Sequence, residues 1–324
     1  MATPRRDFLR LAAAASALPM LPRTAAAQAY PARPVRVIVG YPPGGPTDIF
    51  ARLMAQWLSE RFGQPFVIEN RPGAGSTIGV QAVVNAAPDG YTLITLSTSA
   101  VISSLFYKNL NYNLIRDIAP VCGISVEPLV MVVNPAVKAR TVPEFIADAK
   151  TNPGKIVMAS VGNGTTPHMA GALFMQMAGV EMLHVPYQGA APALTDLLAG
   201  RADVMFEAMP TLVGYLKAGK LHALAVGTTA RSPVLPDVPT VSEFLPGYEG
   251  VVWFGVGAPG KTPADIVERV NREINAGLND PALRAKLEQF GGMPMTGTPD
   301  EFKKRFVDDA EKWSKVIKAA ATKT

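Results

Sequence analysis

Short apolar runs rich in β-branched residues alternate with amphipathic patterns along most of this 324-residue chain. In the first such pair, Val35–Val39 reads as a strand, and a helical pattern through Ile49, Leu53 and Trp57 ends at Gly63. This alternation predicts an α/β fold whose layers are built on mostly parallel sheets. The predicted strands are Val35–Val39, Phe66–Glu69, Thr92–Thr95, Leu129–Val133, Ile156–Ala159, Met182–Val185, Val204–Phe206, Ala223–Val226 and Val252–Val256.

The C-terminal segment changes character, because from Pro263 onward the pattern predicts three helices in succession. The last of them begins at Pro299. Just before it, Thr298 and Glu301 have the spacing of a capping box, in which each residue hydrogen-bonds the backbone N–H of the other. We therefore expect a well-defined start for this final helix.

Residues 1–29 have the features of an export signal. The pair Arg5-Arg6 precedes the letters FLR and a short apolar stretch, which resembles a twin-arginine signal peptide, and small residues offer cleavage sites after Ala27 or Ala29. The apolar run is too short and too rich in alanine to span a membrane. We therefore expect removal of this segment and a periplasmic location for the mature chain.

The formal net charge of +5 falls when this segment is removed. It holds four of the 31 basic and one of the 26 acidic residues, so the mature chain has 27 basic and 25 acidic residues and a net charge of +2. No run of basic residues with interleaved aromatic residues appears elsewhere. The composition therefore gives no reason to expect a nucleic-acid partner.

Cys122 is the only cysteine, which excludes a disulfide within the chain. It lies in an apolar run and is interpreted as a buried residue without a chemical role. No cysteine lies near the predicted cleavage region, so we expect no lipid anchor and a soluble mature protein.

Two glycine-containing loops share one pattern of strand, loop and helix. The letters GYPPGGPTD at 40–48 and SVGNGTTPH at 160–168 both place a proline, Pro46 or Pro167, at the expected first position of a helix. The start of a helix carries unpaired N–H groups and a partial positive charge, which suit a phosphate or a carboxylate. This repeated pattern predicts two similar α/β lobes, each of which offers a helix start.

Other glycine motifs do not fit their usual cofactors. Gly73, Gly75 and Gly79 have the spacing of a dinucleotide fingerprint, but they follow the second predicted strand, Pro72 intervenes, and no acidic residue ends the next strand. The segment 214–220 has the spacing of a P-loop but leads from a helix into a strand. We therefore expect no cofactor.

No serine-hydrolase elbow and no histidine spacing typical of a metal site is present. The chain has three histidines, of which His184 and His222 lie in predicted strands and are interpreted as structural. His168 follows a glycine loop and is either a ligand donor or a helix cap. We expect neither catalytic residues nor a metal site.

Six segments in a fixed order resemble one protein family. They include VIENRPGAGSTIG, ASVGNGTTPHMAGALF, HVPYQGAAPALTDLLAGRADVMFE and WFGVGAPGKTP, and the resemblance runs from about Tyr30 to Trp313. The chain is similar to the Bug-type periplasmic solute-binding proteins of tripartite tricarboxylate transporters. That resemblance implies a non-catalytic, monomeric protein that captures a small organic acid and delivers it to the permease subunits of the transporter.

The resemblance also implies a two-lobed periplasmic-binding fold of type II, with the ligand in the cleft between the lobes. The first lobe is expected to contain residues 30–132 and 250–324, and the second residues 133–249. Family members bind dicarboxylates, tricarboxylates, acidic amino acids or aromatic acids, so the ligand is expected to belong to one of these classes.

The ligand contacts are expected where loops and helix starts of both lobes meet. Glycines allow backbone amides to approach a ligand, and prolines limit the entropy lost on binding. In the first lobe the expected contacts are Tyr41, Pro42, Gly44, Gly45, Asp48, Ser97, Thr98 and Ser99. In the second they are Ser160, Gly162, Gly164, Thr165, Thr166 and His168, with Tyr187, Gln188 and Gly189 in the wall.

Two residues depart from the family pattern. Gln188 stands where the family commonly has lysine, and Glu207 stands where aspartate is more usual. If Glu207 reaches the cleft, it would repel an additional carboxylate or pair with an ammonium or hydroxyl group. Asp48 raises the same question, although an acidic residue is also favoured in the first turn of a helix.

Two other functions are compatible with the same scaffold. An exported enzyme would use His168, Asp48 and Ser97 as its candidate catalytic residues, although nothing in the sequence places a nucleophile beside a base. A ligand-dependent sensor partner would bind a small acid but dock on a receptor in place of a permease.

Overall fold

A computed structural model describes residues 30–321, and the predicted signal peptide lies outside the described residues. Within the described residues, the chain from Arg33 onward forms one compact unit. None of the described helices combines the length and the apolar character that crossing a membrane requires.

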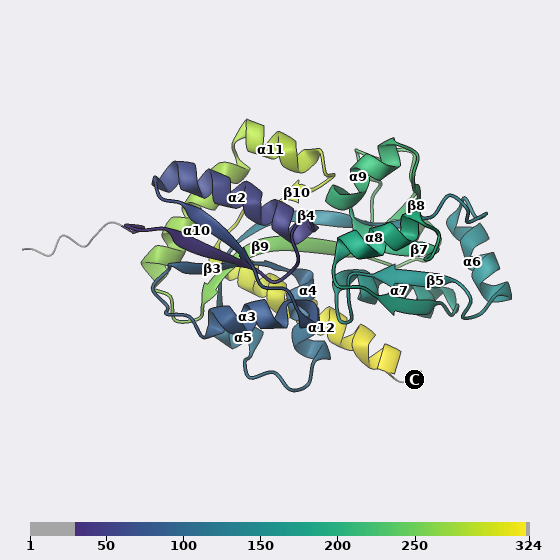
Figure 1. Ribbon diagram of the computed structural model, residues 1–324, viewed down its shortest axis with the longest axis horizontal. Coiled ribbons are helices and arrows are strands. Elements are labelled where there is room, and N and C mark those ends of the chain that lie inside the picture. The colour runs from purple at the N-terminus through teal and green to yellow at the C-terminus, as the bar shows by residue number, and fades with distance from the viewer. Residues whose placement is uncertain (1–29, 322–324) are drawn as a thin grey trace, which may run out of the picture. The chain divides into compact units, whose positions relative to one another are not determined.

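Ten strands form the central β-structure of this unit (Figure 1). Eight follow one another in the order β2-β1-β3-β9-β4-β7-β5-β6, and β8 and β10 pair with β4 outside that path. The strands are β1 (Val35–Val39), β2 (Phe66–Asn70), β3 (Thr92–Ser97), β4 (Ile118–Val133), β5 (Val157–Ser160), β6 (Leu183–Pro186), β7 (Val204–Ala208), β8 (His222–Val226), β9 (Val251–Pro259) and β10 (Met293–Pro294).

The prediction of mostly parallel sheets is wrong at the centre of the structure. The outer pairs β1/β2, β1/β3, β5/β6 and β5/β7 are parallel, as expected for strands joined by helices. However, β9 is antiparallel to both β3 and β4, and β4 is antiparallel to β7 and β8. The reason is that β9 lies between β3 and β4 and that the long strand β4 continues from its pairing with β9 into its pairing with β7 and β8.

The strand β4 is also much longer than the predicted strand Leu129–Val133. Pro120, Gly123 and Pro128 read as breaks in the sequence, yet all three lie within β4. The pairing of β4 with β9 shifts register after Pro120 and again after Gly123, and such bulges accommodate residues that do not suit a regular ladder.

The two-lobed fold follows from the way in which β4 is shared. Residues Ile118–Pro128 pair with β9 in a first sheet, and residues Leu129–Val133 pair with β7 and β8 in a second. Each sheet has its own hydrophobic core. The pairing therefore changes from the first sheet to the second between Pro128 and Leu129.

Helices cover both faces of the sheets, with α2 (purple) on one side and α12 (yellow) on the other in Figure 1. The α-helices are α2 (Pro46–Phe62), α3 (Thr77–Val84), α4 (Thr98–Phe106), α5 (Leu114–Asp117), α6 (Val142–Thr151), α7 (Thr166–Ala178), α8 (Ala190–Leu198), α9 (Met209–Lys217), α10 (Ala264–Leu278), α11 (Pro281–Glu288) and α12 (Pro299–Ala321). Short 3₁₀ turns, η1 and η2, occupy Ala74–Ser76 and Val241–Glu243.

The three predicted C-terminal helices are confirmed as α10, α11 and α12, and so is the capping box. The Thr298 N–H donates to Oε2 of Glu301 at 2.7 Å, and the Glu301 N–H donates to Oγ1 of Thr298 at 3.2 Å. The start of α12 is therefore fixed by two reciprocal hydrogen bonds.

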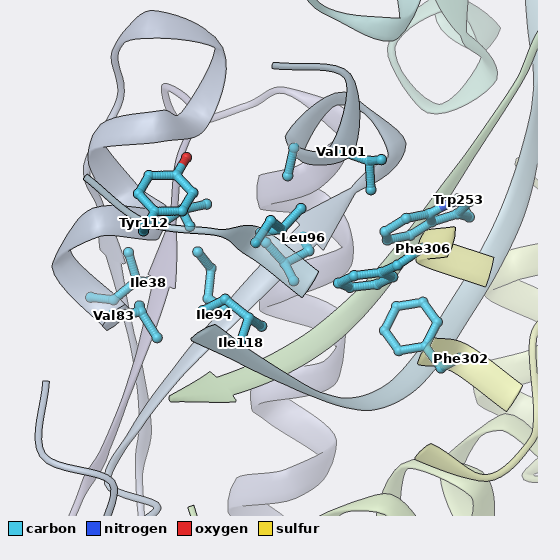
Figure 2. Packing of buried hydrophobic residues seen from close by; sticks show 13 residues of the cluster. Ile38, Val83, Ile94, Leu96, Val101, Tyr112, Ile118, Trp253, Phe302 and Phe306 are labelled. Atoms are coloured by element: carbon cyan, nitrogen blue, oxygen red, sulfur yellow. The ribbon is translucent and has the colours of Figure 1, made fainter. Parts of the chain in front are cut away.

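Aromatic side chains of α12 complete the core of the first sheet (Figure 2). The Trp253 ring meets Phe302 edge-on at 5.1 Å and stacks on Phe306 at 5.2 Å between ring centroids. Further along α12, Trp313 packs with Ile102 of α4 and Met169 of α7. A single helix thus packs against helices attached to both sheets.

Cys122 is buried in β4, as predicted. Burial raises the pKa of its thiol to about 12. The thiol is therefore protonated and unreactive at neutral pH.

Candidate functional site

Loops that follow five strands meet around one cavity. They connect β1 to α2, β3 to α4, β5 to α7, β6 to α8 and β7 to α9, and the cavity encloses about 560 Å³ of empty space that is partly open to solvent. The lining residues are Tyr41, Pro42, Pro43, Gly45, Pro46, Thr47, Ser97, Ser99, Leu129, Val161, Pro167, Gln188, Gly189, Ala190, Ala191, Pro192, Glu207, Ala208, Val252 and Phe254.

The starts of three helices contribute polar groups to this cavity. Gly45 precedes α2, Ser97 precedes α4 and Gly189 precedes α8, and residues from the first turns of these helices also line the cavity. The first N–H groups of an α-helix have no partner within the helix and carry a partial positive charge. Among the described lining residues none is lysine, arginine or histidine, so any partial positive charge that the lining offers a ligand comes from these helix starts.

The loop before α2 is held by Asp48, which does not line the cavity. Its carboxylate accepts hydrogen bonds from Gly44 N at 3.0 Å, Arg52 Nε at 2.8 Å and Asn70 Nδ2 at 2.9 Å. Burial on its own raises the pKa of this carboxyl, but these hydrogen bonds outweigh burial and the pKa is lowered. Asp48 is therefore ionised, and its hydrogen bonds hold the loop before α2 in place.

Tyr41 lies at the junction of this cavity with an outer one. Its hydroxyl donates to the Gly75 carbonyl at 3.3 Å, and burial raises the pKa of the phenol. The outer cavity encloses about 960 Å³ and is lined in part by Gly162 and Tyr187. Tyr41, Pro42, Val161, Gln188 and Gly189 line both spaces.

The start of α7 is occupied by a side chain of α4. Oγ of Ser99 accepts the Thr166 N–H at 2.9 Å and lies 2.8 Å from Oγ1 of Thr166. Ser103 donates to the Gly164 carbonyl at 2.9 Å. Because α7 begins at Thr166, Pro167 takes the second helical position, not the predicted first, and it lines the cavity.

His168 is a cap and not a cavity residue. Its Nδ1 accepts the Gly164 N–H at 3.1 Å, and its ring stacks on His184 at 4.0 Å. Burial lowers the pKa of His168 to about 3 and that of His184 to about 4, so both are neutral at pH 7. Nε2 of His184 lies 2.6 Å from Oγ of Ser160, but Ser160 is 0% exposed and lines neither cavity.

Glu207 reaches the cavity from the end of β7. It is 1% exposed, and its Oε1 accepts the Ala208 N–H at 2.9 Å. None of the described residues hydrogen-bonds its other oxygen, Oε2. Burial raises the pKa of this carboxyl to about 7, so it changes charge near neutral pH.

The structure divides the predicted contact residues into three groups. Some line the inner cavity, some line only the outer one, and the rest brace the surrounding loops. The inner group is Tyr41, Pro42, Gly45, Ser97, Ser99, Gln188, Gly189 and Glu207; the outer group is Gly162 and Tyr187; the bracing group is Gly44, Asp48, Thr98, Ser160, Gly164, Thr165, Thr166 and His168.

The sequence reasoning missed the apolar wall of the cavity. Leu129 of β4 and Val252 and Phe254 of β9 line it, but a strand pattern alone does not say which face meets a ligand. Ala190 and Ala191 were also missed, although the preceding Gly189 marked a helix start. Within the described residues, no group of three or more metal-ligating side chains comes together.

Comparison with known proteins identifies the family. The sequence model of one protein family, the tripartite tricarboxylate transporter family receptor, matches residues 50–321. This chain belongs to that family. Protein BugT of Bordetella pertussis is 36% identical over 300 residues, which are 92% of each chain. A protein from the tcbD-tcbE intergenic region of a Pseudomonas species is 40% identical over 291 residues, which are 89% of this chain and 87% of that protein.

Solved structures of family members share the fold. Rpa4515 of R. palustris, determined with adipate, is 36% identical, covers 90% of this chain and 98% of its own, and has a TM-score of 0.88. MatC from Rhodopseudomonas palustris, with bound malate, is 30% identical, covers 89% of this chain and 100% of its own, and has a TM-score of 0.84. The periplasmic binding protein BugD has a TM-score of 0.85 at 32% identity, over 90% of this chain and 99% of its own.

Proposed function

We propose that this chain is a periplasmic solute-binding protein that captures a small organic carboxylate, a dicarboxylate, tricarboxylate or aromatic acid, for the permease of a tripartite tricarboxylate transporter. The observation that carries the proposal is the cavity lined by three helix starts and by no described basic side chain. Such groups bind an anion without a fixed cation.

The cavity suits a small acid in its chemistry. Besides the three helix starts, its lining offers the neutral polar side chains of Thr47, Ser97, Ser99 and Gln188. Hydrogen bonds to a charged group contribute about 1.5–3 kcal/mol each, so a few N–H donors account for useful affinity. The adipate of Rpa4515 and the malate of MatC support a dicarboxylate as the ligand.

The same cavity supports binding without catalysis. The serine nearest to a histidine nitrogen, Ser160, is buried away from both cavities, and Asp48 is engaged with Arg52. His168 accepts a backbone N–H, so it is not paired with a serine. We therefore propose that the chain is not an enzyme and has no cofactor.

The periplasmic location and the division of the mature chain into two lobes belong to the same proposal. Residues 1–29 direct export by the twin-arginine route, and the mature monomer contains one lobe of residues 30–132 and 250–324 and another of residues 133–249. The change of pairing partner within β4 supports this division, although it falls slightly before the boundary at 132. Isolation of the exported protein and determination of its N-terminal residue test the cleavage.

Isothermal titration calorimetry on the exported protein tests the function. The panel contains dicarboxylates, citrate, aromatic acids, acidic amino acids and NAD(P), and we expect binding to at least one class of acid. Binding raises the melting temperature by mass action, which provides an independent readout. Binding to nucleotides alone, or to no acid in the panel, would contradict the proposal.

A further inference from the structure

Glu207 is the charged side chain of the cavity that carboxylate capture leaves unexplained. A site for anions gains nothing from an acidic group, yet Glu207 lines the cavity, is 1% exposed and has a buried Oε2. Within the described part of the chain, no donor hydrogen-bonds to it. An unpaired carboxylate in such a place is costly unless a bound molecule supplies a donor.

The other side chains that line the cavity are neutral. The polar ones belong to Tyr41, Thr47, Ser97, Ser99 and Gln188, and Phe254 is part of the apolar wall. No lysine, arginine or histidine stands among the described lining residues. The protein therefore offers Glu207 no counter-charge within this space.

The cavity thus has two chemically different parts. The starts of α2, α4 and α8 favour a negative group, whereas Oε2 of an ionised Glu207 is an acceptor and requires a hydrogen bond from its partner. A second carboxylate beside an ionised Glu207 would be repelled strongly in a space with little water.

We propose that Oε2 of Glu207 accepts a hydrogen bond from a hydroxyl or ammonium group of the ligand, so that the site selects hydroxy or amino acids over the corresponding unsubstituted acids. This inference rests on the proposed function, because it assumes that a carboxylate of the same ligand binds at the helix starts. Glu207 is then a specificity-determining residue of the site.

Matched ligands test the inference by calorimetry at pH 8. One set is succinate, malate and aspartate, which share a carbon skeleton and differ in one hydrogen, hydroxyl or ammonium group. A second set is benzoate, 3-hydroxybenzoate and 3-(aminomethyl)benzoate. In whichever set binds, we expect the wild-type protein to prefer a donor-bearing member over the unsubstituted acid by at least about tenfold in Kd. The member of the set with the lower Kd then shows whether Glu207 prefers a hydroxyl or an ammonium group.

The variant Glu207→Gln removes the charge and keeps the shape of the side chain. We expect it to reduce the preference to less than about threefold, because the donor-bearing acid should bind more weakly and the unsubstituted acid more tightly. The matched control is Glu127→Gln, which changes another buried glutamate with an unpartnered oxygen that lines neither cavity. The control should retain the wild-type preference.

The outcomes separate the two proposals. Equal binding of substituted and unsubstituted acids by the wild-type protein, or a preference that persists unchanged in Glu207→Gln, overturns the inference and leaves carboxylate capture intact. Failure of every acid in both sets and in the wider panel to bind overturns both.

Discussion

At the scale of single residues, two buried carboxyl groups have opposite pKa shifts because only one of them has a counter-charge. Asp48 accepts hydrogen bonds from Arg52, Asn70 and Gly44, and its pKa is lowered. Glu127 accepts a hydrogen bond from the Ser125 hydroxyl at 2.7 Å, and burial raises its pKa to about 8. Asp48 is thus stable as an anion, whereas Glu127 is stable as a neutral acid.

Replacement of Glu127 by glutamine should make stability less dependent on pH. Because the pKa of Glu127 is raised on folding, its neutral form favours the folded state at low pH, and this contribution is lost as pH rises from about 4.5 to about 8. At about 1.4 kcal/mol for each pKa unit, we expect Glu127→Gln to raise the free energy of unfolding at pH 8.5 by up to about 5 kcal/mol. Urea denaturation at pH 4.5 and 8.5 measures this difference.

At pH 4.5 the variant and the wild type should have nearly equal stability, because both then carry a neutral side chain at 127. The pH dependence that persists in the variant belongs in part to Glu207, whose pKa is also raised. An equal gain at both pH values would show that packing, not ionisation, distinguishes the two side chains.

Gly189 offers a second test at this scale. Its φ is +109°, and a Cβ at this position would lie 3.1 Å from Cγ of Pro42. We expect Gly189→Ala to lower the free energy of unfolding by about 1–2 kcal/mol and to weaken ligand binding, because both backbone strain and the cavity wall are affected.

Gly214→Ala is the control for this substitution. Gly214 lies in α9, and nothing within 4 Å would meet an added Cβ. Its ligand affinity should match that of the wild type, and its stability should not fall. If calorimetry finds unchanged affinity in Gly189→Ala as well, this part of the wall does not touch the ligand.

At the scale of elements, the start of α12 has a defined energetic contribution. Thr298→Ala removes the side-chain half of the capping box, which accepts the Glu301 N–H. We expect a loss of about 0.5–2 kcal/mol in the free energy of unfolding, measured by urea denaturation. Thr298→Ser keeps the hydroxyl and should retain most of the stability, so an equal loss in both variants would contradict the capping role.

Some helices and strands could be predicted from the sequence alone, and others could not. Runs such as Val35–Val39 and the stop at Gly63 were predictable because periodicity and a left-handed glycine are local signals. The full length of β4 was not, because its bulges are stabilised by pairing with β9, far away in the sequence. Gly45 and Gly189 were predictable as loop residues at the cavity, whereas the cap that Ser99 forms on α7 depends on the meeting of two distant helices.

At the scale of the whole molecule, α12 links the two lobes. Trp313 packs with Ile102 of α4 and Met169 of α7, helices that follow strands of different sheets. We expect Trp313→Ala to lower the free energy of unfolding by about 3–5 kcal/mol and to reduce the m value in urea, since the lobes then unfold less cooperatively.

Trp57→Ala is the comparison for this experiment. Trp57 lies in α2 and donates to the Glu273 carbonyl of α10 at 2.8 Å, so its loss weakens the contact between α2 and α10. It should lower stability with little change in m. An unchanged m value in both variants would show that α12 does not couple the lobes.

The division of β4 between two sheets also bears on how such a receptor can diversify. A chain break or a recombination point between Pro128 and Leu129 would cut one continuous strand, so neither half is a module that can be exchanged intact. New specificity must then arise from single substitutions in the loops around the cavity. The architecture favours gradual drift of preference among related cargoes over the acquisition of a ready-made site from another protein.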